Sequence, residues 1–100
     1  MIVLDNYMIS IVELCKAHKV KFLYIFGSAL TEKFHKESDV DFIVDFENLP
    51  VEDYVDNYFD LKFSLEEILK RSVDLLEEKA IKNPYFLQNI NRQKQLVYGH

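Results

Sequence analysis

The sequence is poor in the residues that cross-link a chain or interrupt its secondary structure. Its 100 residues include one cysteine, two glycines and two prolines. A single cysteine excludes an internal disulfide and favours a reducing compartment. Because 49% of the residues are hydrophobic, a long disordered segment is not expected. Cys15 lies in an apolar helical pattern, so we expect a small buried side chain there and not a reactive thiol.

Long apolar runs and clusters of positive charge are also missing. No run approaches the ~20 residues that span a bilayer, and no basic segment followed by an apolar stretch opens the chain. We therefore expect a cytoplasmic protein that forms one domain over residues 1–100 and binds no membrane. The formal net charge of −5, without a Lys/Arg run, argues against direct nucleic-acid binding.

What the sequence does contain is an alternation of helical and strand-like apolar patterns. Strands joined by helices predict an α/β (α+β) fold, with a small mixed sheet and helices packed on it. The predicted helices cover residues 5–18, 29–35, 51–70 and 83–99, and the predicted strands cover residues 21–26, 39–46 and 72–77. The last helix begins at Asn83-Pro84 and ends at Gly99.

Aromatic residues are unusually frequent, with eight Phe and six Tyr, and a small core does not readily bury them all. In the predicted helix 51–70, Phe59 and Phe63 widen the apolar stripe beyond one core contact. They either cover an edge of the sheet or help to dock a partner. The core stripe of this helix is predicted to be Val51, Tyr54, Val55, Tyr58, Leu61, Leu65, Ile68 and Leu69.

The most informative stretch joins the first two predicted strands. Gly27-Ser28 follows the apolar run 22–26, and Asp39-Val40-Asp41 opens the next strand. A glycine turn lets backbone N–H groups approach a phosphate, and the predicted helix 29–35 would set its N-terminus over this turn. Side chains alternate along a strand, so Asp39 and Asp41 share a face, roughly 6–7 Å apart at their Cα atoms. A phosphate cradle beside a hard-metal site indicates phosphoryl or nucleotidyl transfer.

A third carboxylate, Asp74, lies in the middle of the predicted strand 72–77. A charge between apolar residues costs several kcal/mol unless it is paired or binds a metal. Two interpretations stay open: a metal site of Asp39, Asp41 and Asp74, or a merely polar strand face, with Arg71 as a possible neutralising partner of Asp74. Asp45 shares the acidic face but lies ~13 Å beyond Asp41, too far for the same ion.

Other candidate groups are weak. His18 and His35 lie near predicted helix ends beside lysines, so we expect both to be solvated, and His100 is terminal. No His/Cys cluster has the spacing of a zinc site. Ser28 has no His–acid partner in the pattern, which argues against a covalent nucleophile.

The order strand, Gly27-Ser28, helix, Ser38-Asp39-Val40-Asp41, strand resembles the signature of the nucleotidyltransferase superfamily related to DNA polymerase β. The compact length is similar to its minimal nucleotidyltransferase (MNT) branch, which includes antitoxins paired with HEPN-domain toxins. The resemblance extends to Asp74 in the third strand and to the C-terminal Val97-Tyr98-Gly99.

The resemblance implies a polymerase β-like fold and transfer of AMP from ATP. Asp39, Asp41 and Asp74 would be the catalytic residues and the ligands of two Mg²⁺ ions, with Asp74 as base. The nucleotide would be bound by Gly27, Ser28, Lys33 and Ser38. The acceptor would be a side-chain hydroxyl of a partner protein, a tyrosine of a HEPN toxin, which the chain would silence as its antitoxin within a hetero-oligomer.

The sequence departs from that family directly after Gly27-Ser28. Many members have roughly Gly-Ser-Arg-Ala-Arg-Gly, where this chain has Ala29, Leu30, Thr31 and Glu32. The change removes bidentate phosphate donors, and Lys33 would replace one of them as a point charge. Two rival functions therefore stay open: an antitoxin that acts by binding alone, and a transferase for a small molecule such as an aminoglycoside.

Overall fold

Four strands and three α-helices make up the chain in this computed structural model, which describes residues 1–99, so His100 lies outside the described residues. The helices are α1 (Met8–Ala17), α2 (Val51–Leu69) and α3 (Pro84–Gln93). The strands are β1 (Val20–Phe26), β2 (Val40–Phe46), β3 (Val73–Glu77) and β4 (Gln95–Tyr98). Short 3₁₀ turns cover Asp5–Tyr7, Gly27–Leu30 and Glu78–Ala80. The predicted α/β class is confirmed.

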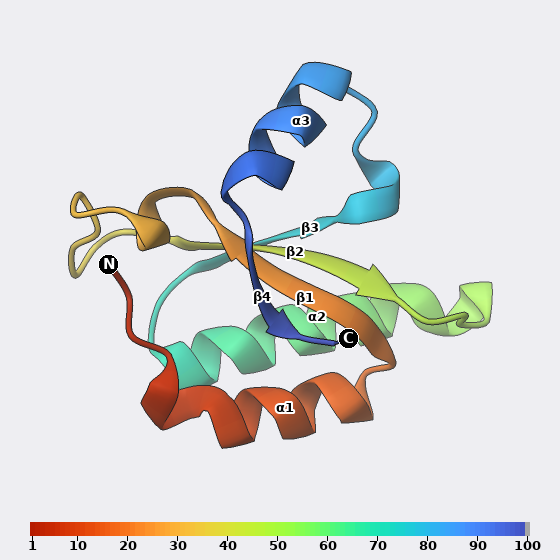
Figure 1. Ribbon diagram of the computed structural model, residues 1–100. Coiled ribbons are helices and arrows are strands. Elements are labelled where there is room, and N and C mark those ends of the chain that lie inside the picture. The colour runs from red at the N-terminus through yellow and green to blue at the C-terminus, as the bar shows by residue number, and fades with distance from the viewer. Residues whose placement is uncertain (100) are drawn as a thin grey trace.

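The strands form one mixed sheet in the order β3-β2-β1-β4. The β1/β2 and β1/β4 pairs are antiparallel, whereas β2 and β3 are parallel. The parallel pair is joined through α2, as a parallel connection requires. Figure 1 shows α1 and α2 along one face of the sheet and α3 standing on the other.

The two faces of the sheet are covered unequally. The face toward α1 and α2 carries the large core, in which Phe42, Leu61 and Leu65 are completely buried. The alternation predicted for strand 39–46 is confirmed, because Val40, Phe42, Val44 and Phe46 all point into this core. The face toward α3 carries only a small buried cluster of Phe26, Ile43 and Ile90. The acidic residues of β2 lie on this lightly covered face.

The C-terminal segment differs from its prediction. Asn83 does cap α3, because its side chain accepts hydrogen bonds from the backbone N–H of Tyr85 (2.9 Å) and Phe86 (3.2 Å). However, α3 ends at Gln93, and residues 95–98 form β4 against β1, which would otherwise leave its edge open. Gly99 is not a helix stop: its φ is +119°, and a Cβ there would collide with Phe22 and the Lys21 carbonyl.

The predicted helix 29–35 is also absent. Gly27–Leu30 forms a single 3₁₀ turn, and the backbone of Thr31 is extended. Thr31 ends the turn because both its backbone N–H (3.0 Å) and its hydroxyl (2.8 Å) donate to the Ser28 carbonyl. Residues 31–39 are therefore a loop of turns and bends, without a helix N-terminus over Gly27-Ser28.

On α2, the prediction that Val51 and Val55 belong to the core stripe is wrong. Leu61, Leu65 and Leu69 are buried as expected, but Val51 and Val55 are 86% and 58% exposed. Phe59 and Phe63 are 44% and 56% exposed, so covering a sheet edge does not bury them. These four apolar residues recur every four positions and form one exposed ridge along the helix.

The burial predicted for Cys15, His18 and His35 is confirmed for two of them and wrong for the third. Cys15 is buried as predicted, and burial raises the pKa of its thiol to about 12. His35 is exposed, as expected. The prediction that His18 is solvated is wrong, because its ring is buried. Nδ1 lies 2.7 Å from the Leu14 carbonyl and Nε2 lies 2.5 Å from the Asp60 carboxylate, so His18 links α1 to α2.

Across residues 1–99, no helix has the length and apolar character that crossing a membrane requires.

Candidate active site

The candidate site begins where β1 ends. Gly27 follows β1 with a φ of +78°, a conformation that L side chains rarely adopt. A Cβ on Gly27 would collide with the carboxylate oxygen Oδ2 of Asp41, which belongs to the neighbouring strand β2. Both the backbone conformation and the Asp41 carboxylate packed against it therefore favour glycine at this position. The sequence argument for Gly27 considered only the approach of a phosphate.

Strand register then brings a second carboxylate beside Asp41. Across the sheet, Phe26 pairs with Asp41, and Asp41 pairs with Asp74 on the parallel strand β3. Partner residues in register point to the same face. Burial raises the pKa of the Asp41 carboxyl above its ordinary value of 3.8, and the charges of Asp74 and Asp39 raise the pKa further. The structure thus brings Asp39, Asp41 and Asp74 into one electrostatic cluster.

Among residues 1–99, no Lys, Arg or His side chain forms an ion pair with this cluster. Within residues 1–99 the ion pairs are His18–Asp60, Lys79–Asp45 and Lys94–Glu78, and none includes Asp39, Asp41 or Asp74. In the same part of the chain, no three His, Cys, Asp or Glu side chains converge closely enough to hold one metal ion as they stand.

Asp74 is exposed, so the expectation of a buried charge at this position is wrong. The sequence argument assumed a costly buried charge, but β3 is the outer strand of the sheet and its Asp74 side chain reaches solvent. What supports Asp74 is its register with Asp41. Two tyrosine hydroxyls of α2 fix β3: Tyr58 donates to the Leu75 carbonyl, and Tyr54 donates to Glu77 at 2.7 Å. Burial, with the charges of Asp74 and Glu77, raises the pKa of Tyr58.

The predicted nucleotide-binding residues lie on the turn and loop between β1 and β2. Ser28 is exposed in the 3₁₀ turn beside Gly27. Lys33 is exposed on the following loop and forms no ion pair within residues 1–99. The hydroxyl of Ser38 accepts a hydrogen bond from the His35 N–H (3.1 Å), so it shapes the loop that leads to Asp39.

In the family pattern Gly-Ser-Arg-Ala-Arg-Gly, the two arginine positions correspond to Ala29 and Thr31 of this chain, and Leu30 stands between them. Ala29 is completely buried, its carbonyl accepts a hydrogen bond from the Ile2 N–H (2.8 Å), and Leu30 packs against the main hydrophobic cluster. Thr31 is exposed, and its hydroxyl donates to the Ser28 carbonyl (2.8 Å). None of these three side chains carries a positive charge for a phosphate, whereas Lys33 and Lys36 are exposed on the following loop.

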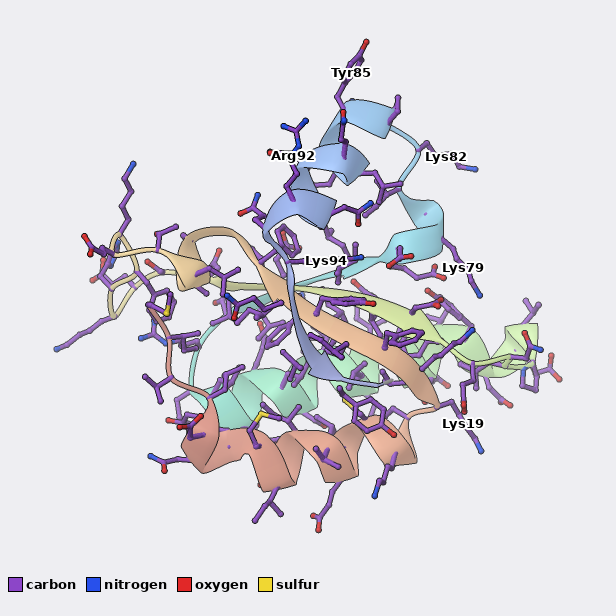
Figure 2. The ribbon with its side chains drawn as sticks, viewed as in Figure 1. Lys19, Lys79, Lys82, Tyr85, Arg92 and Lys94 are labelled. Carbon is purple, nitrogen blue, oxygen red and sulfur yellow. The ribbon has the colours of Figure 1, made fainter. Side chains whose placement is uncertain are left out.

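The other end of the acidic face is different. Asp45 lies 3.5 Å from the ammonium group of Lys79, and Glu78 lies 3.7 Å from that of Lys94. The Lys94 ammonium also lies 4.0 Å from the centre of the Tyr24 ring, between α3 and the sheet. Figure 2 shows Lys82, Tyr85 and Arg92 pointing outward from the α3 region. Asp45 therefore has a positive partner within the chain, which is consistent with its exclusion from the metal site.

Sequence reasoning missed the role of Arg71. This residue was considered as a counter-charge for Asp74, but in residues 1–99 it forms no ion pair. Its Nη1 instead donates to the carbonyls of His35 (2.7 Å), Lys36 (3.0 Å) and Ser38 (3.1 Å). No periodic pattern signals a side chain that recognises backbone carbonyls. The one available signal was an arginine placed directly before the strand that carries Asp74.

Comparison with known proteins shows the family to which the chain belongs. Residues 10–100 match the family model described as "Polymerase beta, Nucleotidyltransferase". A protein of Methanocaldococcus jannaschii named putative protein adenylyltransferase is 38% identical over 81 residues, which are 81% of this chain and 78% of that protein. The chain therefore belongs to the polymerase β nucleotidyltransferase family.

Solved structures share the fold. One, described as a putative minimal nucleotidyltransferase, superposes with a TM-score of 0.76 at 25% identity and covers 92% of this chain and 90% of that chain. Another is an MNT antitoxin complex with a tri-AMPylated Shewanella oneidensis HEPN toxin. It has a TM-score of 0.67 at 20% identity and covers 98% of this chain and 74% of that chain. The resemblance drawn from the Gly-Ser and Asp-x-Asp motifs is confirmed.

Proposed function

We propose that this chain is a Mg²⁺-dependent protein adenylyltransferase that transfers AMP from ATP to a side-chain hydroxyl of a partner protein. The observation that carries the proposal is the cluster of Asp39, Asp41 and Asp74 with no counter-charge among residues 1–99. It lies beside Gly27, whose missing Cβ makes room for Asp41. The name of the Methanocaldococcus jannaschii relative supports the same class of reaction.

The donor set fits magnesium. The three carboxylates supply only hard oxygen ligands, which Mg²⁺ prefers over nitrogen or sulfur. A divalent cation between them would also relieve the repulsion that raises the pKa of Asp41. When bound there, Mg²⁺ supplies charge neutralisation for the triphosphate and makes an attached hydroxyl more acidic. The resemblance implies two ions.

The chain's own groups would divide the remaining work. Gly27, through its backbone N–H, and Ser28 would hold the β- and γ-phosphates, with Lys33 as a point charge and Ser38 at the loop end. Asp74, exposed at the outer strand, can meet an acceptor from solvent and take its hydroxyl proton. The acceptor oxygen forms a bond to the α-phosphorus, the bond to the β-phosphate oxygen breaks, and pyrophosphate leaves.

The partner we propose is a HEPN-domain toxin, modified on a tyrosine and thereby silenced. One support is the solved MNT antitoxin complex, whose HEPN toxin is tri-AMPylated. Another is the exposed ridge of Val51, Val55, Phe59 and Phe63 along α2. Apolar surface of this kind on a small domain is characteristic of a protein interface.

Label transfer tests the proposal. Wild type, Asp41→Asn and Asp45→Asn would each be incubated with Mg²⁺ and a lysate of the native host, using ATP labelled in either the α- or the γ-phosphate. We expect a labelled protein only with α-label, and only with wild type and Asp45→Asn. Mass spectrometry of the labelled protein would locate the AMP group. Label from the γ-phosphate, or an equally labelled product with Asp41→Asn, would contradict the proposal. An aminoglycoside added as acceptor tests the small-molecule alternative.

Neutralisation by binding alone is the second candidate. It is favoured by the replacement of the usual arginines with Ala29, which is buried in the core, and Thr31, which carries no charge, together with the exposed α2 ridge. Co-expression with the toxin separates the two functions. If Asp41→Asn still protects cells, binding suffices; if toxicity returns while the complex still forms, transfer is required.

A further inference from the structure

The loop that carries Asp39 has little hydrophobic support of its own. From Thr31 to Asp39, only Phe34 and Ser38 are partly shielded, and the other side chains are exposed. Hydrogen bonds within the loop fix its internal shape: the Ser38 N–H donates to the His35 carbonyl (3.0 Å), and the His35 N–H donates to the Ser38 hydroxyl (3.1 Å). These bonds do not fix where the loop lies relative to the sheet.

Arg71 fastens the loop to the sheet. Its Nη1 lies 2.7, 3.0 and 3.1 Å from the carbonyl oxygens of His35, Lys36 and Ser38, and its two N–H groups donate to these three acceptors, one N–H being shared. Its guanidinium carbon lies 4.2 Å from the centre of the Phe34 ring, at cation–π distance. Phe34 in turn packs against the main hydrophobic cluster. A single side chain thus holds both the backbone and the one anchored ring of the loop.

The last of these carbonyls belongs to the peptide that joins Ser38 to Asp39. A hydrogen bond to this carbonyl restrains the peptide that precedes Asp39 at the start of β2. Arg71 is also three residues before Asp74, and the adjacent Ser72 carbonyl accepts the Val40 N–H at 3.0 Å. The chain segments that lead to Asp39 and Asp74 are therefore held together at the same point.

We propose that Arg71 is a positioning residue, which holds Asp39 in place beside Asp41 and Asp74 for metal binding. This inference rests on the proposed metal site but not on the identity of the acceptor. The Arg71 side chain needs both its charge and its planar shape for this role, because the guanidinium stacks on the Phe34 ring while it donates to carbonyls. Lysine would keep the charge and lose the stacking geometry.

The test compares Mg²⁺ binding to purified wild type, Arg71→Met and Arg71→Lys. Loss of a group that orients a ligand typically weakens metal binding about 10–100-fold. We expect a loss in that range for Arg71→Met and a smaller one for Arg71→Lys, measured by titration calorimetry with a non-hydrolysable ATP analogue. Should Arg71→Met fold poorly, Arg71→Lys carries the comparison.

Lys70 supplies the matched control. It is the exposed residue next to Arg71 and has a φ of +56°, which asparagine adopts readily, so Lys70→Asn removes one positive charge at small backbone cost. We expect Lys70→Asn to bind Mg²⁺ within a factor of ~3 of wild type, because the exposed Lys70 side chain makes no ion pair within residues 1–99 and an exposed charge is screened by salt.

A double variant distinguishes positioning from general support of the fold. If Arg71 acts through Asp39, Arg71→Met in an Asp39→Asn background causes no further loss of Mg²⁺ affinity, because coupled groups are not additive. A further loss of the full single-variant size in the double variant would overturn the inference. So would Mg²⁺ binding by Arg71→Met equal to wild type, or no Mg²⁺ response in any variant. Failure to find AMP transfer would instead count against the proposed function.

Discussion

Asp41 and Asp45 lie on the same face of β2, four residues apart, yet their electrostatic surroundings are opposite. Asp45 has the Lys79 ammonium at 3.5 Å, a partner supplied by the chain itself. Asp41 is packed against Gly27, and its pKa is raised by burial and, to a smaller extent, by the charges of Asp74 and Asp39. The lysine supplies Asp45 with a counter-charge, although the Oδ1 atom of Asp45 is buried and accepts no hydrogen bond within residues 1–99. A carboxylate crowded by like charges calls for a cation from outside, and this difference separates the site from the rest of the acidic face.

The largest expected effect is on catalysis. Asp41→Asn should lower AMP transfer at least ~10³-fold, because metal-assisted charge stabilisation contributes several kcal/mol to the transition state. Asp45→Asn should stay within a few-fold of wild type. Initial rates with α-labelled ATP and a purified acceptor would measure both. Equal losses in the two variants would remove the distinction between the aspartates.

Metal-dependent stability should separate the same residues. Mg²⁺ at about 100 times its dissociation constant stabilises a folded protein by ~2.7 kcal/mol. For a domain of this size that is a rise in Tm of roughly 10–20 °C. We expect the rise in wild type and in Asp45→Asn, and little of it in Asp39→Asn or Asp41→Asn. Thermal denaturation with Mg²⁺ and with EDTA measures it, and a full shift in Asp39→Asn would exclude that residue as a ligand.

Gly27→Ala should destabilise the fold through both strain and collision. A left-handed backbone conformation costs an ordinary residue about 1–3 kcal/mol, and here the new Cβ also meets the Asp41 carboxylate. The cost should be smaller in an Asp41→Ala background, in which the collision is relieved. Urea denaturation of the four proteins in the cycle measures the coupling. A cost that is the same in both backgrounds would show that Asp41 does not press on Gly27.

The smallest expected effect is on the pH dependence of stability without metal. The pKa of the Asp41 carboxyl is above 3.8 in the folded chain, so in the window between the unfolded and folded pKa values the folded state binds more protons. Stability must then fall as pH rises through that window. Asp41→Asn should lose this contribution, and Asp45→Asn should keep it. Urea midpoints from pH 3 to 7 in EDTA provide the comparison, and identical curves for wild type and Asp41→Asn would contradict it.

Part of this arrangement was predictable from the sequence. The alternation in β2 predicted that Asp41 and Asp45 lie on one face of the strand and Phe42 and Val44 on the other. The apolar run of β1 predicted that Gly27 lies at the end of a strand. Those features depend on local periodicity, which a sequence displays directly. The choice of Asp74 agreed with the register, although the burial argument behind it was wrong.

What the sequence did not reveal depends on contacts between distant segments. Residues 95–98 looked like the end of a helix, and they form β4 because the edge of β1 is available to pair with them. The loop 31–39 had too few apolar positions to specify its shape, and Arg71 fixes it through carbonyls that any residue would provide. His18 looked like a surface residue beside lysines until α2 brought Asp60 to its ring.

The most direct test of the central claim is titration calorimetry of Mg²⁺ into wild type, Asp41→Asn and Asp45→Asn, each saturated with a non-hydrolysable ATP analogue. The uncompensated cluster of Asp39, Asp41 and Asp74 predicts binding by wild type and Asp45→Asn with similar affinity, and loss of that binding in Asp41→Asn. Equal binding by Asp41→Asn and wild type would show that the metal, if it is needed, is held elsewhere, and the proposed active site would be wrong.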